Sequence, residues 1–106
     1  MIKIVNLTPH PISITDGDTF APSGKVARVK AIQEDAGIIN GIPVKTQTFG
    51  DIIDLPEPQD DTIFIVSAIV LSAAKAIGRT DVVAPDTSNA VRNDQGHIVS
   101  VPGFVK

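Results

Sequence analysis

The sequence predicts a single α+β domain with a mainly antiparallel β-sheet of about seven short strands and one buried helix. Three observations lead to this prediction. An Asn40-Gly41 pair separates two apolar, β-prone stretches, eight prolines and eight glycines are spread along the chain, and only residues 68–77 are rich in helix formers. Hairpin signals favour antiparallel pairing, and a lone helix can cover one face of such a sheet.

Length and composition set the first limits. A chain of 106 residues suits one domain, covering residues 1–106, and its 42% hydrophobic and 20% charged residues are ordinary for a globular protein. The sequence has no Cys, which excludes disulfides, thiolate metal sites and Cys nucleophiles. No apolar run approaches the roughly 20 residues that span a bilayer, and the N-terminus lacks a signal pattern. We therefore expect a cytoplasmic protein without a membrane partner.

The charge and the aromatic content exclude one class of partner. The net charge is −3, whereas a nucleic-acid binder needs a basic face. The chain has no Trp or Tyr and only four Phe, so it offers no platform on which single-stranded bases could stack. We expect no nucleic-acid partner.

The first third of the chain alternates short strands with turns. Prolines at positions 9 and 11 interrupt the first strand because each removes a backbone donor and fixes φ. The apolar residues Ile12 and Ile14 alternate with polar ones, which is typical of a half-buried strand. The predicted strands are 2–7, 12–15 and 25–33, and the predicted turns are 8–11, 16–18 and 22–24.

Asn40-Gly41 is the strongest local signal in the chain. The two residues supply the positive φ angles of a type I′ hairpin turn. Pro43, in the second arm of this hairpin, lacks a donor, so that arm is predicted to be at an edge or bulged. The acidic, proline-bearing stretch 51–61 is predicted to be a surface loop.

The next segment combines a strand with the helix. Residues 62–66 form a continuous apolar strand, and Ser67 can cap a helix over 68–77. Only Ser72 and Lys75 interrupt the apolar surface, which predicts a largely buried helix. Gly78 is a natural helix terminator.

The last part of the chain contains a strand and a hairpin. Residues 82–84 form a short strand that Pro85 stops. Residues 90–92 and 97–101 form a second hairpin around the turn 93–96. Gly96 suits the left-handed position of a bulged turn.

The first candidate site is the turn after the N-terminal strand. His10 lies between two prolines, which would present its imidazole in a fixed direction, able to exchange protons or bind a phosphate. A structural explanation competes with this one, because Asn6 and Thr8 can instead hydrogen-bond the local backbone.

The second candidate site follows the helix. Arg79 could clamp a phosphate or carboxylate, and Asp81 or Asp86 could hold a ribose hydroxyl or orient His10. The structural alternative is equally simple. Arginine is favoured at a helix C-terminus, and Pro-Asp-Thr is common turn chemistry.

Two further arginines lie on predicted strands. Arg92 precedes the second hairpin turn, and Arg28 shares a strand face with Lys30. Both could reach a ligand, although a solvated surface position also explains them. No phosphate-binding loop, nucleophile elbow or His-Glu-x-x-His pair is present. With two His and no Cys we predict no metal site and no cofactor.

Several motifs occur together in an order that resembles a known family. They include Asn6-Leu7-Thr8-Pro9-His10, Asn40-Gly41-Ile42-Pro43-Val44 and the run from Arg79 to Thr87. On these residues the chain resembles a family of small uncharacterised proteins encoded by phages, prophages and their bacterial hosts. Similar proteins tend to have Gly-Pro where this chain has Ser88-Asn89. The resemblance implies a place in the host cytoplasm and a part in countering host defence, since some small phage proteins sequester nucleotide immune signals.

The leading hypothesis is a homo-oligomeric binding protein that traps a small anionic ligand, such as a cyclic nucleotide or an ADP-ribose derivative. The proposed ligand-binding residues are Asn6, Thr8, His10, Arg28, Arg79, Asp81, Asp86 and Arg92. One alternative is a small phosphodiesterase or hydrolase that uses His10 with an aspartate. Another is an interaction protein, either an inhibitor of a host factor or a virion accessory protein. A shared cleft would favour the first two hypotheses, and dispersed residues would favour the third.

Overall fold

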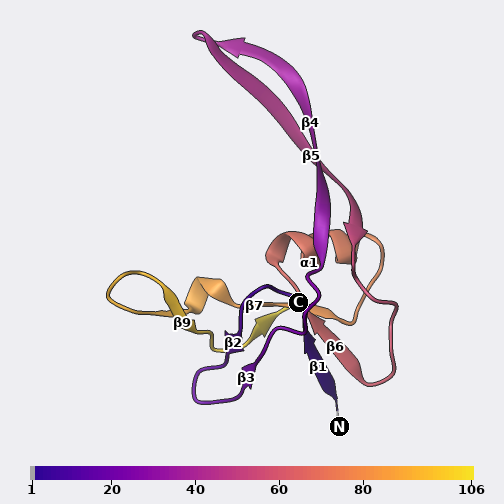
Figure 1. Ribbon diagram of the computed structural model, residues 1–106, viewed down its shortest axis with the longest axis vertical. Helices are drawn as coiled ribbons and strands as arrows, with labels where there is room; N and C mark the ends of the chain where they lie inside the picture. The colour runs from indigo at the N-terminus through magenta and orange to yellow at the C-terminus, as the bar shows by residue number, and fades with distance from the viewer. Residues whose placement is uncertain (1) are drawn as a thin grey trace.

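The computed structural model describes residues 2–106 and shows a small body from which one long arm projects (Figure 1). The strands are β1 (Lys3–Asn6), β2 (Ile12–Ser13), β3 (Thr19–Phe20), β4 (Arg28–Ile39), β5 (Ile42–Ile53), β6 (Thr62–Ile65), β7 (Val82–Pro85), β8 (Val91–Arg92), β9 (Ile98–Ser100) and β10 (Phe104–Val105). One helix, α1, spans Ala68–Ala76, and a 3-10 turn, η1, spans Thr87–Asn89. The expectation of a mainly β fold with one helix is confirmed for these residues.

The body is organised around a four-stranded sheet in the order β1-β6-β7-β10. β1, β6 and β7 are parallel, and only β10 runs antiparallel to its neighbour β7. The prediction of one mainly antiparallel sheet of about seven strands is therefore wrong. The strands fall into one mixed sheet and three two-stranded ladders, and α1 forms a crossover that returns the chain to run parallel to β6.

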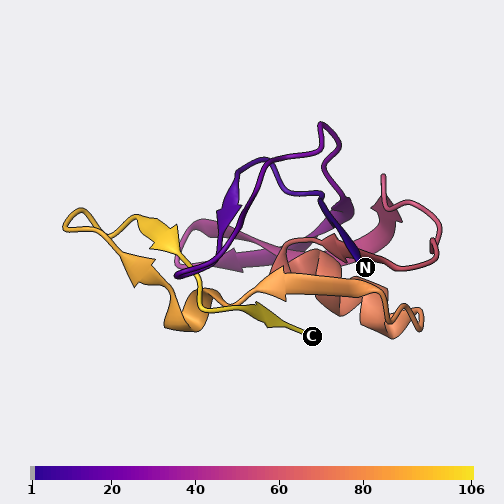
Figure 2. The same cartoon turned by 90° about the horizontal axis from the view of Figure 1, so that it is seen from below.

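The core lies under the two central strands. β6 is apolar from Ile63 to Ile65, which is the usual pattern for a parallel strand inside a sheet. Phe64 and Val66 are 1% and 0% exposed. The helix contacts β7 on one side of the sheet, and the view from below shows β7 running across it (Figure 2).

The predicted Ser67 cap and Gly78 terminator are confirmed, although the helix ends at Ala76 rather than at residue 77. The Ser67 hydroxyl accepts a hydrogen bond from the Val70 amide at 3.3 Å. At the other end Gly78 has φ +84°, the Gly78 amide donates to the Lys75 carbonyl at 3.0 Å, and the Arg79 amide donates to the Ala74 carbonyl at 2.9 Å. This pair of bonds is a Schellman motif, which turns the chain sharply toward β7.

The expectation of a largely buried helix is wrong. Val70, Leu71 and Ala74 form the buried face, whereas Ile69 is 52% and Ile77 67% exposed. The reason is architectural. Besides β7, the helix contacts β4 and β5, and these contacts leave part of its apolar surface open.

The arm is the antiparallel hairpin of β4 and β5. Asn40 and Gly41 have φ angles of 51° and 78°, so the predicted type I′ turn is confirmed. The strands are longer than predicted, because β4 continues to Ile39 and β5 to Ile53. Cross-strand pairing holds Glu34 and Asp35 in β4 although acidic residues have low strand propensity.

The arm extends well clear of the body. The molecule measures 54 × 39 × 22 Å, and its radius of gyration is 16.4 Å, against about 13 Å for a compact chain of this length. Every residue from 30 to 43 is exposed. The tip therefore has no contact with the core.

Two small hairpins complete the body, β2 with β3 and β8 with β9. In the second, the Asn93 side-chain oxygen accepts bonds from the Gln95 and His97 amides, and Gly96 has φ +81°. The predicted hairpin and its left-handed glycine are confirmed. Ile14 bridges Val101, which brings the two hairpins together.

Within the described residues, the helix is too short to cross a bilayer.

Candidate functional site

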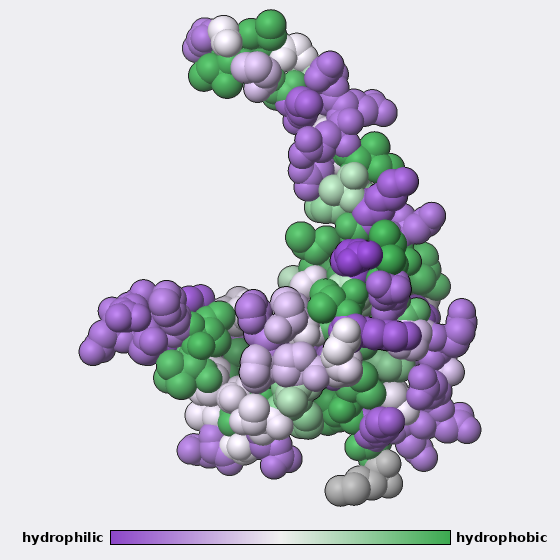
Figure 3. Space-filling model, viewed as in Figure 1, coloured by the Kyte–Doolittle hydropathy of each residue, from purple (hydrophilic) through white to green (hydrophobic). Residues whose placement is uncertain are grey.

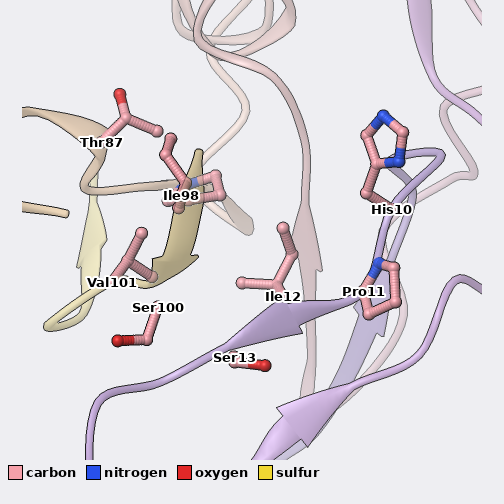
Figure 4. Close-up of a pocket in the computed structure, with 9 residues that line it drawn as sticks. His10, Pro11, Ile12, Ser13, Thr87, Ile98, Ser100 and Val101 are labelled. Atoms are coloured by element: carbon pink, nitrogen blue, oxygen red, sulfur yellow. The ribbon is translucent and has the colours of Figure 1, made fainter. Parts of the chain in front are cut away.

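A cleft of about 240 Å³ lies where the turn after β1 faces the turn after β7. Figure 4 shows His10 and Pro11 on one side, Thr87, Ile98 and Val101 on the other, and Ile12 between them. The full lining is His10, Pro11, Ile12, Ser13, Pro85, Thr87, Ile98, Ser100 and Val101. Two segments that the sequence marked separately thus share one cleft.

The His10 turn is held by one buried amide. The Asn6 side chain, 2% exposed, donates to the His10 carbonyl at 2.8 Å and to the Phe20 carbonyl at 3.0 Å. Its oxygen accepts from the Thr8 amide at 2.9 Å and from the Thr8 hydroxyl at 2.6 Å. Asn6 and Thr8 therefore fix the turn, and the exposed His10 side chain projects from it.

The opposite wall is fixed through the backbone. The Val101 amide donates to the Ser13 carbonyl at 2.9 Å, and the Thr15 amide donates to the Val101 carbonyl at 2.8 Å. The Asp86 amide donates to the Gly103 carbonyl at 3.0 Å, which ties the turn after β7 to the segment before β10. These bonds give the cleft preformed walls.

The lining is apolar at its centre and polar at its rim. Ile12, Ile98 and Val101 supply the apolar surface, while His10 and Thr87 bring an imidazole and a hydroxyl. The hydroxyls of Ser13 and Ser100 also line the cleft, but both already have partners. The Ser13 hydroxyl lies 3.0 Å from the Thr19 hydroxyl, and the Ser100 hydroxyl lies 2.7 Å from the Thr15 hydroxyl. Ligand clefts commonly combine an apolar lining with a few polar groups that fix orientation.

Arg79 and Asp81 form a bidentate pair with each other. Nε and Nη2 of Arg79 donate to the two carboxylate oxygens at 2.9 and 2.8 Å, and Nη2 also donates to the Pro56 carbonyl at 2.9 Å. Both side chains are about 15% exposed. The hydrogen bond from Arg79 lowers the pKa of Asp81, and the same bond raises the pKa of Arg79. The pair ties the 55–61 loop to the start of β7 and lies outside the cleft.

The remaining candidates lie at three different places. The Asp86 carboxylate accepts a hydrogen bond from the Asn89 side-chain Nδ2 at 3.0 Å. Arg92 donates to the Gly96 carbonyl at 2.8 Å, and the Arg28 guanidinium lies 3.9 Å from the Asp54 carboxylate at the root of the arm. Of the eight predicted residues, His10 alone lines the cleft. The predicted ligand-binding residues are thus dispersed, which is the arrangement expected of an interaction protein.

The hydrophobic lining from β9 was missed from the sequence. Ile98 and Ser100 were assigned only to a hairpin, and their approach to Ile12 depends on the contact between Ile14 and Val101, which are far apart in the chain. No local pattern signals such a contact. Among residues 2–106, no three His, Asp or Glu side chains gather in a way that could hold a metal ion.

Comparison with known proteins gives no match among family models, curated proteins or solved structures.

Proposed function

We propose that this protein is a small-molecule binding protein that holds a flat ring system in the cleft between the His10 turn and the β7–η1 turn. The ligand class that we favour is a nucleotide-derived signal, captured through its base or nucleoside part. As the family resemblance implies, the role would be that of a phage-type accessory protein that sequesters such a signal. The observation that carries the proposal is the cleft itself, in which His10 and Thr87 border an apolar surface, although the other predicted residues lie elsewhere.

The size and lining of the cleft support a ring. Its volume of about 240 Å³ is just below the roughly 300 Å³ at which pockets for drug-sized ligands begin. One heterocycle fits, with its faces against Ile12 and Ile98 and its edge atoms near His10 and Thr87. Any phosphates would extend toward solvent, because Arg79 and Arg92 are engaged elsewhere.

The hydrogen bonds of two nearby carboxylates favour binding of the ligand without its hydrolysis. A general base needs an imidazole or carboxylate with a partner that orients it. Asp81 is bonded to Arg79 and Asp86 to Asn89, so neither of these carboxylates is hydrogen-bonded to His10. We therefore propose capture of the ligand rather than its hydrolysis.

Calorimetry with a panel of nucleosides, mononucleotides, cyclic dinucleotides and cyclic ADP-ribose isomers tests the proposal. We expect heat with at least one compound, and a weakening of about tenfold in His10→Ala if that side chain makes one good polar contact. The matched control is His97→Ala, because His97 is exposed at the turn between β8 and β9, outside the lining.

Three results would contradict the proposal. They are no heat with any compound, equal losses in His10→Ala and His97→Ala, and chromatographic product that accumulates with the wild-type protein. The last result would favour the hydrolase alternative instead.

A further inference from the structure

The arm has two unpaired strand edges. β4 and β5 form a two-stranded ladder, and within residues 2–106 no further strand joins it. An isolated two-stranded hairpin is marginally stable in water, and its open edges can pair with a strand of another chain. Figure 3 shows hydrophilic side chains along the middle of the arm, so a contact there depends on backbone pairing rather than on apolar surface.

The regular part of the ladder lies between two bulges. Toward the tip, residues 36–37 of β4 face a single residue of β5, and toward the root, residues 50–51 of β5 face a single residue of β4. Between these bulges, residues 31–35 pair without interruption with residues 45–49. Because a bulge disrupts pairing, 45–49 is the part of the β5 edge that can accept another strand.

Alternation along β5 determines which backbone groups point outward. Ile39 and Ile42 flank the two-residue turn and are paired, and residues at this position exchange both of their backbone hydrogen bonds. Bonded and non-bonded pairs alternate along an antiparallel ladder. The N–H and C=O groups of Lys45, Gln47 and Phe49 therefore point away from β4, toward the open edge.

The two edges of the arm differ in charge. The regular stretch of β4 includes Glu34 and Asp35, and pairing this edge with its own copy would bring carboxylates together. The stretch 45–49 of β5 has Lys45 as its one charged residue, and it contains the β-branched Thr46 and Thr48. The β5 edge is therefore the one that can pair with a copy of itself.

We propose that two copies of this chain pair antiparallel through their β5 edges, about a two-fold axis at Gln47. Gln47 is the centre of 45–49, so only this axis pairs the whole regular stretch with itself. It places Thr46 opposite Thr48 of the second copy, and threonine pairs across strands are favourable. It also places Lys45 opposite Phe49 of the second copy.

The side chains on the face of Gln47 are compatible with this axis. Gln47 accepts a hydrogen bond from Gln33 at 3.0 Å, so the axis joins the glutamine pairs of both copies into one ladder. Phe49 is 50% exposed, and a lysine beside an aromatic ring is a favourable neighbour. The Lys45 residues of the two copies are offset by four positions, or about 14 Å, so like charges do not meet.

The proposed contact is small. It joins the stretch 45–49 of each copy through backbone hydrogen bonds, as in other cases where a strand is added to the edge of a sheet. Interfaces below about 1,200 Å² are typical of weak, transient association. We therefore expect a concentration-dependent dimer with a dissociation constant on the order of 100 μM.

Matched substitutions at the two bonded glutamines test the axis. Gln47→Lys and Gln33→Lys both break the hydrogen bond between these side chains, so they perturb the arm alike. Only Gln47→Lys brings its new charge against the same charge of the second copy, because the two Gln33 positions would be three strand spacings, about 14 Å, apart. We expect Gln47→Lys to raise the dissociation constant at least about tenfold and Gln33→Lys to raise it less than about threefold. Sedimentation equilibrium measures both.

A mixture of two variants gives the decisive result. Gln47→Lys and Gln47→Glu should each be monomeric alone, and their equimolar mixture should recover the dimer because opposite charges then meet at the axis. Each chain keeps its own substitution in the mixture, so only a contact between copies explains a recovery. Wild type that is monomeric at about 1 mM overturns the proposal, as do equal losses in the two lysine variants or a mixture that stays monomeric.

Hydrogen exchange identifies the paired edge independently. As the concentration of wild type rises, the amides of Lys45, Gln47 and Phe49 should become protected, because their outward N–H groups gain partners. The amides of Ala31 and Gln33, on the outer edge of β4, should exchange at the same rate throughout. Protection that rises at Ala31 and Gln33 instead would place the contact on the other edge and overturn the proposal.

Discussion

Asn6 has two donors and one acceptor oxygen on its side-chain amide, and the fold uses both ends. The donors hold the carbonyls of His10 and Phe20, and the oxygen holds Thr8. Asn6 lies at the end of β1, next to the central strand β6. The buried amide therefore links the rigid sheet to the exposed imidazole.

A substitution at Asn6 can separate the donor role of its side-chain amide from the acceptor role. Asn6→Asp keeps an acceptor for Thr8 but removes both donors and places a charge beside two carbonyl oxygens. We expect the free energy of unfolding to fall by at least about 2 kcal/mol, since buried carbonyls lose their partners. Urea denaturation measures this change, with Gln59→Glu in the exposed loop before β6 as the control. A loss below about 0.5 kcal/mol, the usual effect at a surface site, would show that the turn stands without the amide.

The Arg79–Asp81 pair predicts a pH dependence. Hydrogen bonds from Arg79 lower the pKa of Asp81 below its ordinary value of 3.8. The folded carboxylate therefore gives up its proton more readily than the unfolded one, and its contribution to stability is complete above about pH 4. The contribution disappears as the pH falls through the folded-state pKa.

Asp81→Asn should remove that contribution. We expect a loss of about 1.5–3 kcal/mol at pH 7, the range for hydrogen bonds that involve charged groups. The difference from wild type should shrink as the pH falls below about 4. Denaturation series at several pH values measure it, with Asp94→Asn in the exposed hairpin turn as the control. A difference that stays constant down to pH 2 would contradict the assignment.

The site could be predicted only in part at this scale. The Thr8-Pro9-His10 turn and the Pro85-Asp86-Thr87 turn were both recognisable, because proline and short polar residues have local meanings. That Arg79 would bond Asp81 was not foreseen. Arg79 and Asp81 are two residues apart, and both were predicted to bind a ligand. The Pro56 carbonyl that completes their contact comes from a loop that is distant in the sequence.

The helix offers a test of backbone geometry at the scale of an element. Gly78 has φ +84° and Gly103 does not have positive φ, yet a Cβ at either position would meet no atom within 4 Å. Both positions therefore have room for a methyl group, and they differ only in backbone conformation. We expect Gly78→Ala to cost about 1 kcal/mol and Gly103→Ala to cost less, because only the first forces alanine into the left-handed region. Thermal denaturation of both variants compares them, and equal midpoints would contradict the prediction.

Elements defined by neighbouring residues were predictable, and pairings between distant residues were not. Ser67, Gly78 and Asn40-Gly41 each act within a few residues, so the sequence marks the ends of the helix and the turn of the arm. The parallel pairing of β1 with β6 joins residues 3–6 to 62–65. Hairpin signals in the sequence predict antiparallel neighbours. The crossover through α1 instead makes β6 and β7 parallel.

For the whole molecule, the arm and the body should be energetically separable. The core is built around residues such as Leu7, Phe64 and Val82, with Val29 and Ile52 packed against it, and includes nothing from 33–47. Replacing 33–47 by Asn-Gly would join the paired residues Ile32 and Thr48 by a two-residue turn. We expect the free energy of unfolding to change by no more than about 1 kcal/mol. Calorimetry of dilute protein checks this, and loss of a cooperative transition would show that the arm belongs to the core.

The arm is inserted between two paired strands, since β4 and β5 lie between β1 and β6 in the chain. The entropic cost of closing such a loop grows only with the logarithm of its length. The stability of the body therefore depends little on the length of the arm. Two residues removed from each strand would shorten the arm by about 7 Å and leave every side chain on its original face. The number of residue pairs in the hairpin therefore sets how far its tip lies from the body and from the cleft.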